Sequence, residues 1–408
     1  MSVCELGNLH SIEQAISALT DTLKQQTTRQ SITLQDAHQH ILAQSIYAQV
    51  DVPQWDNSAM DGYALRANDL QNTDRLPLAG RIAAGDQPEQ KLATGQCMHI
   101  LTGAPVPLGA DTVVPQENCN ISSDSIQFKR YQAGGNIRRR GEEIQQGQLL
   151  LKTGTRLRAQ EIGLLASQGI ASVEVYTPLR IGLISSGNEL AELGQPLKAG
   201  QIYDINSHSL KALFTGLGFQ VTHYAKMPDD LQQNIESLSQ ACSEQDILIS
   251  SGGVSVGEED HLKHAVSTLG QLNLWRVAIQ PGKPLAFGTI GNTPWIGLPG
   301  NPAAALITAL IIARPALLKA QGASDYKQQS VSIPALFDWQ KARPRQQYLH
   351  ARLIAQENGQ LHVDIHPKQS SAMLIAASWA DGLVEIKPNT CVAKGDLVSF
   401  IPYASLLS

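Results

Sequence analysis

The spacing of apolar residues along the chain separates segments of different character. Five apolar residues recur at helical spacing between residues 11 and 27, which predicts an amphipathic helix: Ile12, Ala15, Ile16, Leu19 and Leu23. Residues 34–48 predict a second helix that runs into a strand. From about residue 49 to 140 the apolar runs are short and β-prone, and glycine and proline interrupt them, so we expect a separate small β domain.

Strands and helices alternate between residues 178 and 326. This alternation predicts a mostly parallel sheet with right-handed crossovers. The segment ends in a long apolar helix, in which Asn301 is the expected N-cap and Pro302 the first helical residue. Pro315 is expected to kink or end this helix, because proline lacks the backbone N–H.

After about residue 327 the apolar pattern is entirely β. Five runs predict a small terminal barrel or sandwich: Val331–Phe337, Gln347–Ile354, Leu361–Ile365, Leu383–Ile386 and Asp396–Ile401. The predicted fold is therefore multidomain, α/β plus β. It has a central three-layer α/β domain with a mostly parallel sheet, a small inserted β domain and a C-terminal β-barrel-like domain.

Composition narrows the class of protein. The 408 residues are 42% hydrophobic, enough for packed cores in two to four domains. The net charge of −5 argues against nucleic acid or an anionic membrane as the main partner. The 5 cysteines show neither zinc spacing nor a disulfide framework, and the N-terminus lacks a secretory signal. Because the longest apolar run, Ala303–Ala313, is too short to span a bilayer, we expect a cytoplasmic protein.

Two turns of one kind follow strands of the α/β segment. Ile184-Ser-Ser-Gly187 and Ile249-Ser-Ser-Gly252 both offer close backbone N–H groups and hydroxyls, which favour an anion at a helix start. The second turn is followed by Glu258, Glu259 and Asp260. An anion site that carries carboxylates usually needs a divalent cation, typically Mg²⁺ for a phosphate. The alternative is a plain Gly-rich turn before a helix with an acidic first turn.

Four acids follow strands or open helices in the same segment, namely Glu189, Asp204, Asp229 and Asp260. Loops at the carboxyl ends of parallel strands meet at one edge, where α/β proteins bind ligands. We therefore expect the four carboxylates to face one crevice, although each alone could be a helix N-cap.

The small β segment carries two polar motifs. Asp56, Asn57, Ser58 and Asp61 could coordinate an oxyanion or a metal, but a cluster of Asx turns that shapes a loop is favoured on composition. In the segment Asn136-Ile-Arg-Arg-Arg-Gly-Glu-Glu143, three consecutive guanidinium groups suit a tetrahedral oxyanion. A solvated turn with local ion pairs explains this segment equally well.

With these motifs, the chain resembles the molybdopterin molybdenumtransferase family, of the MoeA type and similar to the C-terminal half of gephyrin. Five blocks carry the resemblance in order: Asp56-Asn-Ser-Ala-Met-Asp-Gly-Tyr63, Leu101-Thr-Gly-Ala-Pro105, Asn136-Ile-Arg-Arg-Arg-Gly-Glu142, Ser250-Ser-Gly-Gly-Val-Ser-Val-Gly257 and Gly297-Leu-Pro-Gly-Asn-Pro302. The resemblance implies insertion of molybdate into adenylated molybdopterin, with release of AMP and with Mg²⁺ as cofactor. It also implies a homodimer whose active cleft combines the α/β domain of one subunit with the small β domain of the other.

The resemblance implies four domains. They are a linking domain (28–48 and 141–177), the small β domain (49–140), the α/β molybdopterin-binding domain (7–27 and 178–326) and the C-terminal β-barrel domain (327–408). Transient contact with molybdopterin adenylyltransferase and with molybdoenzymes is implied as well.

Site residues carry over motif by motif. The implied catalytic residues are Asp61, Glu189, Asp229 and Asp260, of which Asp260 and Glu189 would bind the metal ion. The implied substrate-binding residues are Thr102, Arg138, Asp204, Ser251, Gly252, Gly253, Ser255, Lys283, Pro299 and Asn301. Asp61, Thr102 and Arg138 would come from the partner subunit. Some members have lysine where this chain has Gln280, so Arg276, Arg139 or Lys283 would carry more of the anion binding.

Two other functions remain open from the sequence. A molybdopterin adenylyltransferase has a similar α/β domain, but it would need only residues like 178–326. A non-catalytic scaffold that binds the pterin would instead favour an exposed groove for a partner.

Overall fold

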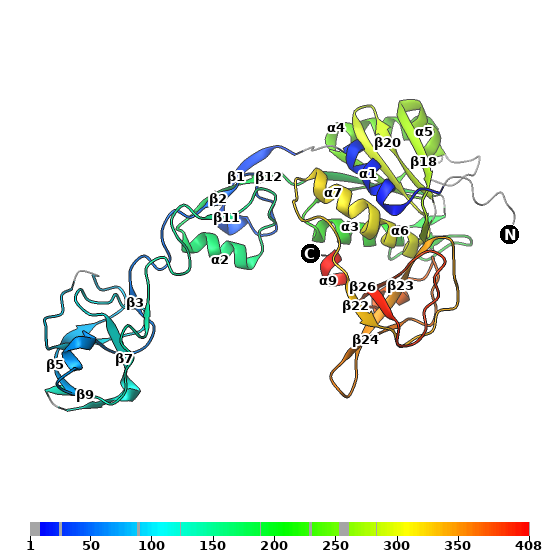
Figure 1. The fold of residues 1–408 in the computed structure, drawn as a ribbon. Coiled ribbons are helices and arrows are strands. Elements are labelled where there is room, and N and C mark those ends of the chain that lie inside the picture. The colour runs from blue at the N-terminus through cyan, green and yellow to red at the C-terminus, as the bar shows by residue number, and fades with distance from the viewer. Residues whose placement is uncertain are drawn as a thin grey trace. The chain divides into compact units, whose positions relative to one another are not determined.

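The computed structural model describes residues 9–23, 27–87, 90–122, 124–187, 189–227, 231–252, 261–282 and 284–407 (Figure 1). The chain forms two compact units. The large unit contains Met1–Ala43, Gly154–Arg158 and Val173–Ser408, and the small unit contains Gln44–Thr153 and Ala159–Ser172. The resemblance implies four domains, and each compact unit is larger than one of them. The boundaries of the four domains stay predictions.

A six-stranded sheet is the centre of the large unit. Its order is β16 (Gln220–Met227), β13 (Arg180–Ser186), β17 (Ile247–Ser251), β21 (Thr293–Leu298), β20 (Pro284–Ile290) and β18 (Gly270–Arg276). The first four strands are parallel, and β20 and β18 are antiparallel to their neighbours. The mostly parallel sheet expected from the sequence is confirmed.

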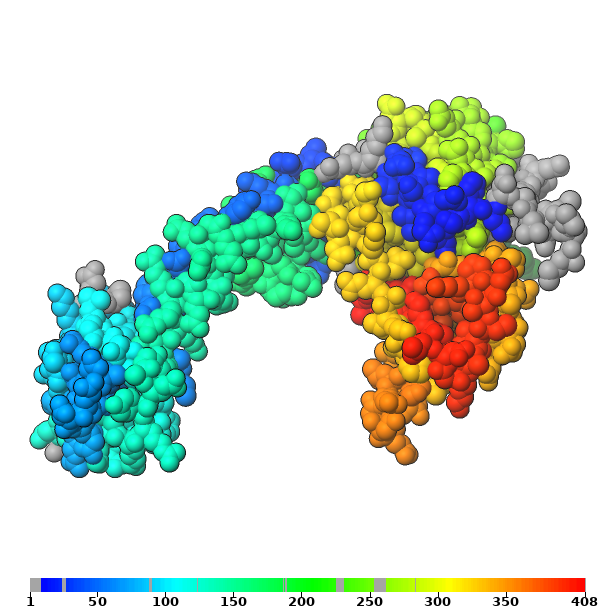
Figure 2. All heavy atoms as spheres, in the orientation of Figure 1, coloured from blue at the N-terminus to red at the C-terminus, as the bar shows by residue number. Residues whose placement is uncertain are grey.

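Helices cover both faces of this sheet, which makes the three layers. On one face α4 (Leu231–Glu244) and α5 (His261–Leu269) pack on side chains such as Leu248. On the other face α1 (Ile12–Leu23), α3 (Ile205–Gly216) and the apolar helix after Asn301 pack on side chains such as Ile249. Figure 2 shows α1 in dark blue beside the yellow apolar helix. Successive residues of β17 thus enter opposite cores, as strand geometry requires.

The apolar helix is continuous from Pro302 to Ala320. It comprises α6 (Pro302–Thr308), a π-helical turn (Ala309–Ala313) and α7 (Arg314–Ala320). Pro315 does not end the helix. Proline has no backbone N–H to donate, and the π-helical turn directly before Pro315 changes the hydrogen-bond spacing so that the helix continues. By length and composition this helix could cross a membrane, but 89% of its apolar window is buried inside the protein, as in a core helix.

The C-terminal strands close into a barrel. Their order is β22 (Val331–Pro334), β26 (Leu397–Pro402), β25 (Gly382–Ile386), β23 (Gln346–Ala355) and β24 (Leu361–Ile365). Ala335, directly after β22, bridges Val363 of β24, so the two ends of the sheet meet. Two short helices, α8 (Ile375–Trp379) and α9 (Tyr403–Leu406), complete this part. The short strand β19 (Ile279–Gln280) pairs in parallel with β23 and joins the barrel to the α/β part.

The helix expected at the start of residues 34–48 is wrong, whereas the strand expected after it is present. The segment has only a 3-10 turn, Leu34–Asp36, between β1 (Arg29–Thr33) and β2 (Ile46–Tyr47). The backbone N–H groups of Gln39 and Leu42 donate instead to the carbonyls of Leu157 and Thr155, at 2.7 and 2.9 Å. Pairing with a distant segment therefore overrides the local helical pattern. The strand β12 (Ser172–Tyr176) pairs with β1.

The small unit contains the expected β domain. Its six-stranded sheet has the order β7 (Thr112–Pro115), β4 (Gly62–Leu65), β6 (Cys97–Ile100), β5 (Arg75–Ile82), β9 (Ser125–Phe128) and β8 (Cys119–Ile121). The unit also holds α2 (Ala159–Ser167), the pair of β2 with β11 (Leu149–Leu151), and the pair of β3 (Asn57–Ser58) with β10 (Ile137–Arg138).

Candidate functional site

The two Ser-Ser-Gly turns lie next to each other. They end the neighbouring parallel strands β13 and β17, in which Ser185 is paired with Ser251. The Leu-Pro-Gly-Asn segment ends the adjacent strand β21, where Leu298 is also paired with Ser251. Three motifs far apart in sequence thus meet at one edge of the sheet, as parallel topology dictates.

The start of α3 ties these strand ends together. Asn206 donates its side-chain amide to Ser251 Oγ at 2.8 Å and to the carbonyl of Gly300 at 2.7 Å. The Ser251 hydroxyl in turn lies 3.3 Å from the carbonyl of Pro299. The Ser251 side chain therefore fixes the geometry of the edge, and the backbone N–H of Gly252, which donates to the carbonyl of Leu298 at 3.2 Å, fixes the start of the turn.

Asp204 and Glu189 occupy this region in different ways. Asp204 is the N-cap of α3 and is half-buried, and its carboxylate accepts hydrogen bonds from Ser207 N at 3.0 Å and Ser185 Oγ at 2.6 Å. Burial alone would raise the pKa of Asp204, but these hydrogen bonds and the nearby His223 outweigh it and lower the pKa. Glu189 is exposed, and within the described part of the chain its carboxylate has no partner.

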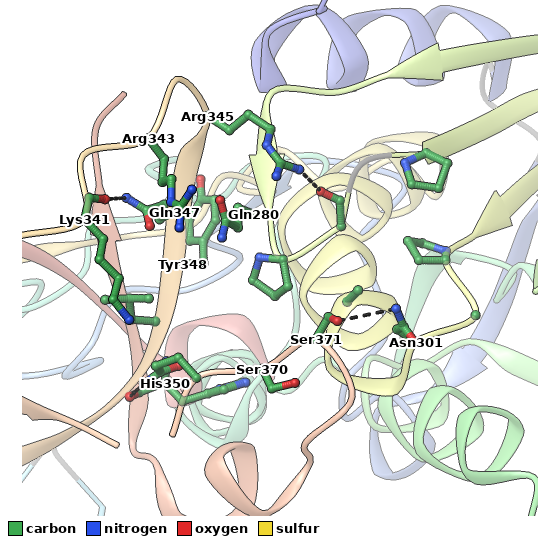
Figure 3. Close-up of a pocket in the computed structure, with 18 of the residues that line it drawn as sticks. Gln280, Asn301, Lys341, Arg343, Arg345, Gln347, Tyr348, His350, Ser370 and Ser371 are labelled. Atoms are coloured by element: carbon green, nitrogen blue, oxygen red, sulfur yellow. Dashed lines mark hydrogen bonds between the residues drawn. The ribbon is translucent and has the colours of Figure 1, made fainter. Parts of the chain in front are cut away.

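A cavity of about 730 Å³ lies between the α/β part and the barrel, both in the large unit (Figure 3). The α/β side contributes Gly252, Pro299, Gly300, Asn301 and the loop Gln280–Gly282. The barrel side contributes three cationic residues, Lys341, Arg343 and Arg345, and no carboxylate lines the cavity among the described residues. The site is therefore electropositive and suits an anion.

The three cations stand on one loop that is held at several points. Arg345 donates to the carbonyls of Ile279 and Gly282, at 3.4 and 3.3 Å, and so links the barrel to the α/β part. The buried side chain of Gln347 donates to the carbonyl of Lys341 at 3.1 Å. Arg343 is exposed, and its guanidinium has no hydrogen-bond or ion-pair partner within the described ranges. Arg343 is thus the cation with most freedom to bind an anion.

Uncharged donors complete the cavity wall. Ser371 and Asn301 face each other, with Asn301 Nδ2 3.4 Å from Ser371 Oγ. His350 is buried, and its Nδ1 lies 2.9 Å from the hydroxyl of Tyr403, while its Nε2 has no partner among the described groups. Burial lowers the pKa of His350 to about 4, so the ring is neutral at pH 7. Asn301 occupies the N-cap position expected from the sequence, but its side chain makes no capping hydrogen bond.

In the small unit, two of the three consecutive arginines form ion pairs. Arg139 pairs with Asp56 and Arg140 with Asp51, each at 2.6 Å. For Arg139 and Arg140, the interpretation of the segment as a turn with ion pairs is therefore the better one. Arg138 lies on β10 opposite Asn57, exposed and without an ion pair to any described residue. A role of Arg138 in substrate binding stays a prediction.

Asp61 and Thr102 are paired in the small unit. Asp61 Oδ1 accepts hydrogen bonds from the backbone N and the hydroxyl of Thr102, each at 2.7 Å. These hydrogen bonds lower the pKa of Asp61. The Asp61 carboxylate therefore stays ionised over a wide pH range and keeps its second oxygen for another partner.

Several predicted site residues lie outside the described part of the chain: Asp229, Asp260, Gly253, Ser255 and Lys283. The described residues contain no group of three His, Cys, Asp or Glu side chains that could hold a metal ion. Lys341, Arg343, Arg345, His350 and Ser371 were not expected from the sequence. A signal existed in the alternating cations of Lys341-Ala-Arg-Pro-Arg345, directly before a strand.

The fold and the sheet edge define a protein with a three-layer α/β domain that is joined to a β barrel. Three family models match the chain: the MoeA N-terminal region (domains I and II) over residues 10–169, a probable molybdopterin binding domain over 182–319, and the MoeA C-terminal region (domain IV) over 332–403. The chain is 36% identical to the molybdopterin molybdenumtransferase of Haemophilus influenzae, over 97% of this chain and 99% of that relative. The chain belongs to the MoeA-type molybdopterin molybdenumtransferase family.

Other relatives agree. The molybdopterin molybdenumtransferase of a Nostoc species is 37% identical over 74% of this chain and 72% of that relative. The crystal structure of the molybdopterin biosynthesis MoeA protein from Pyrococcus horikoshii matches with a TM-score of 0.81 and 26% identity, over 97% of this chain and 100% of that one. Because the matches include the segments on both sides of the α/β domain, they support the transferase over the adenylyltransferase alternative.

Proposed function

We propose that this chain inserts molybdenum from molybdate into adenylated molybdopterin, with release of AMP, and that the cavity between the α/β part and the barrel holds the oxoanion. One observation carries the location. Three cationic residues converge on a cavity that has no described carboxylate and that opens onto the carboxyl ends of β17 and β21. Guanidinium groups bind tetrahedral oxoanions bidentately, and an uncompensated positive cavity attracts a dianion.

The neighbouring turn suits the phosphate part of the pterin substrate. The backbone of Ser251 and Gly252 lies at the sheet edge, and Gly252 also lines the cavity. Gly252 has a φ of 86°, a conformation that favours glycine and turns the chain sharply there. Both anions would thus meet at one place, which is what a reaction between molybdate and an adenylated substrate requires.

We propose Mg²⁺ as the cofactor, held by Glu189 and Asp260. The fit rests on Glu189, whose exposed carboxylate is not engaged by another described residue. Mg²⁺ needs only one or two carboxylates when phosphate oxygens and water complete its shell. When bound, the ion would offset the repulsion between the anions and polarise the phosphoanhydride.

We also propose a homodimer in the cytoplasm. The resemblance implies that Asp61, Thr102 and Arg138 act on a partner subunit's cleft. The ionised Asp61 and the unpaired Arg138 are exposed, which such a role requires. Contacts with molybdopterin adenylyltransferase and with molybdoenzymes stay part of this proposal.

The test is AMP release from adenylated molybdopterin, measured with and without molybdate. We expect molybdate to stimulate release in the wild type. A Lys341→Ala/Arg343→Ala variant should need about ten to a hundred times more molybdate for half-maximal release, the effect of losing charge-assisted contacts. Lys327→Ala is the matched control, since Lys327 follows the far end of the helix that begins at the cavity. Pterin binding without AMP release under any condition would instead indicate a scaffold.

A further inference from the structure

Three side chains outside the cavity form a hydrogen-bonded cluster at the edge of the sheet. Ser185 Oγ on β13 lies 2.6 Å from Asp204 Oδ2 and 3.1 Å from Nε2 of His223 on β16. His223 Nε2 is 3.9 Å from the same Asp204 oxygen. Ser185 is 3% exposed, so solvent does not compete for its hydroxyl. The cluster contains a hydroxyl, an imidazole and a carboxylate, the groups of a nucleophilic triad.

The order of hydrogen bonds excludes a triad. A serine hydroxyl has one proton, and the short distance to the Asp204 carboxylate identifies that group as its acceptor. Ser185 Oγ can then only accept from His223, so Nε2 of His223 carries a proton. In a nucleophilic triad the histidine must instead take the serine proton. The cluster is therefore a chain of donors that ends on Asp204.

Asp204 connects this cluster to the wall of the cavity through the start of α3. Its Oδ1 accepts the backbone N–H of Ser207 at 3.0 Å and caps α3. Two residues after Asp204, Asn206 binds Ser251 Oγ and the carbonyl of Gly300, and Gly300 lines the cavity. The chain of contacts thus runs from His223 on the outermost strand to the floor of the proposed anion site.

We propose that Ser185 and His223 are positioning residues that hold Asp204 and the start of α3 in the geometry the site needs, and that protonation of His223 releases this hold. An imidazolium attracts Asp204 directly, in competition with Ser185 and with the capped N–H of Ser207. The first turn of α3, which carries Asn206, is then no longer held in place by Asp204. Among the described residues, the other charged groups that act on His223 are His208 and Lys211 of α3, whose positive charge opposes protonation. This inference deepens the proposed function and rests on it only where activity is measured.

The first test does not depend on activity. Histidine signals of the full-length protein are followed by NMR from pH 4.5 to 8, and the His223 signal is assigned by its loss in His223→Gln. Because burial lowers the pKa of His223, we expect its midpoint below the ordinary value of about 6.5. Ser185→Ala should shift this midpoint, since it removes the acceptor of the Nε2 proton. An unchanged midpoint in Ser185→Ala overturns the cluster, whatever the protein catalyses.

The second test is the pH profile of molybdate-stimulated AMP release. The wild type should lose kcat/KM on the acid side, below about pH 6.5. In His223→Gln, whose amide donates to Ser185 without titrating, this acid limb should move to lower pH while the rate at pH 7.5 stays within about three-fold. The activity of Ser185→Ala should fall about ten-fold at pH 7.5, the effect of one lost hydrogen bond to a charged group, and that of His223→Ala about five-fold, the effect of one lost hydrogen bond between uncharged groups. Thermal melts of all variants separate this loss from unfolding.

The outcomes separate the two proposals. An acid limb that is the same in His223→Gln and in the wild type overturns the positioning role and leaves the transferase intact. Absence of AMP release in the wild type at every pH overturns the proposed function, and the NMR titration then decides the cluster alone.

Discussion

Arg345 of the barrel donates a hydrogen bond to the carbonyl of Gly282 in the α/β part, at 3.3 Å. With a second hydrogen bond to Ile279, this contact fixes the loop Gln280–Gly282 against the loop that carries Lys341 and Arg343. Arg345 is therefore a link between the two walls of the cavity as well as a positive charge in it. The two roles predict different behaviour on substitution.

Replacing Arg345 by alanine should weaken molybdate use more than replacing Arg343. Both variants lose one charge, but only Arg345→Ala also frees the Gln280–Gly282 loop. We expect Arg345→Lys to restore the charge and part of the link, because both hydrogen bonds come from the single nitrogen Nη1 and a lysine ammonium can also donate more than one hydrogen bond. The measurement is the molybdate concentration for half-maximal AMP release in the three variants. Equal effects of Arg343→Ala and Arg345→Ala would show that the link has no role.

The three consecutive arginines should differ in their effects. Arg139→Ala and Arg140→Ala each break an exposed ion pair, so each should change the free energy of unfolding by less than about 1 kcal/mol. Arg138→Ala should leave stability unchanged and lower activity with adenylated molybdopterin and molybdate. Urea denaturation and AMP release measure the two effects. Full activity of Arg138→Ala would assign the whole segment to a structural turn.

Thr102→Ala should raise the pKa of Asp61 part of the way towards the ordinary value. The backbone N–H of Thr102 still donates in this variant, and only the hydroxyl is lost. Because the folded pKa of Asp61 is lowered, its contribution to stability is present above the unfolded pKa and is lost as the pH falls through the folded pKa. Carboxyl ¹³C titration measures the shift, and Thr102→Ser is the control that should keep the wild-type value.

Asp61→Ala and Asp260→Asn should complement each other in mixed dimers. If each cleft uses Asp61 of one chain and Asp260 of the other, a heterodimer keeps one intact cleft and about half of the wild-type activity. Co-expression with two different tags isolates the heterodimer for the AMP assay. A purified heterodimer without activity would mean that both residues serve the same cleft from one chain.

Much of the fold could be predicted because the patterns are local. The alternation of strands and helices after residue 178 predicts a parallel sheet, and the apolar stripe of residues 11–27 predicts α1. The segment 34–48 could not be predicted in this way. Its backbone hydrogen bonds go to residues more than a hundred positions later in the chain, such as Leu157, and local periodicity does not contain that information.

The site could be predicted only where parallel topology dictates it. The turns at Ser185 and Ser251 meet because they end neighbouring strands. The cationic wall could not be placed, because Arg343 and Arg345 approach the sheet edge only through the docking of the barrel and the pairing of β19 with β23. In the sequence these arginines stand some 40 residues after Asn301, among strands that carry no other sign of a site.

The location of the oxoanion is tested most directly by anomalous scattering. Crystals of the full chain are soaked in molybdate, and data collected on both sides of the molybdenum absorption edge locate the metal without reference to activity. We predict a peak in the cavity next to Arg343, Lys341 and Ser371, and its loss in Lys341→Ala/Arg343→Ala crystals soaked in the same way. A peak beside Arg138 with none in the cavity would contradict this account.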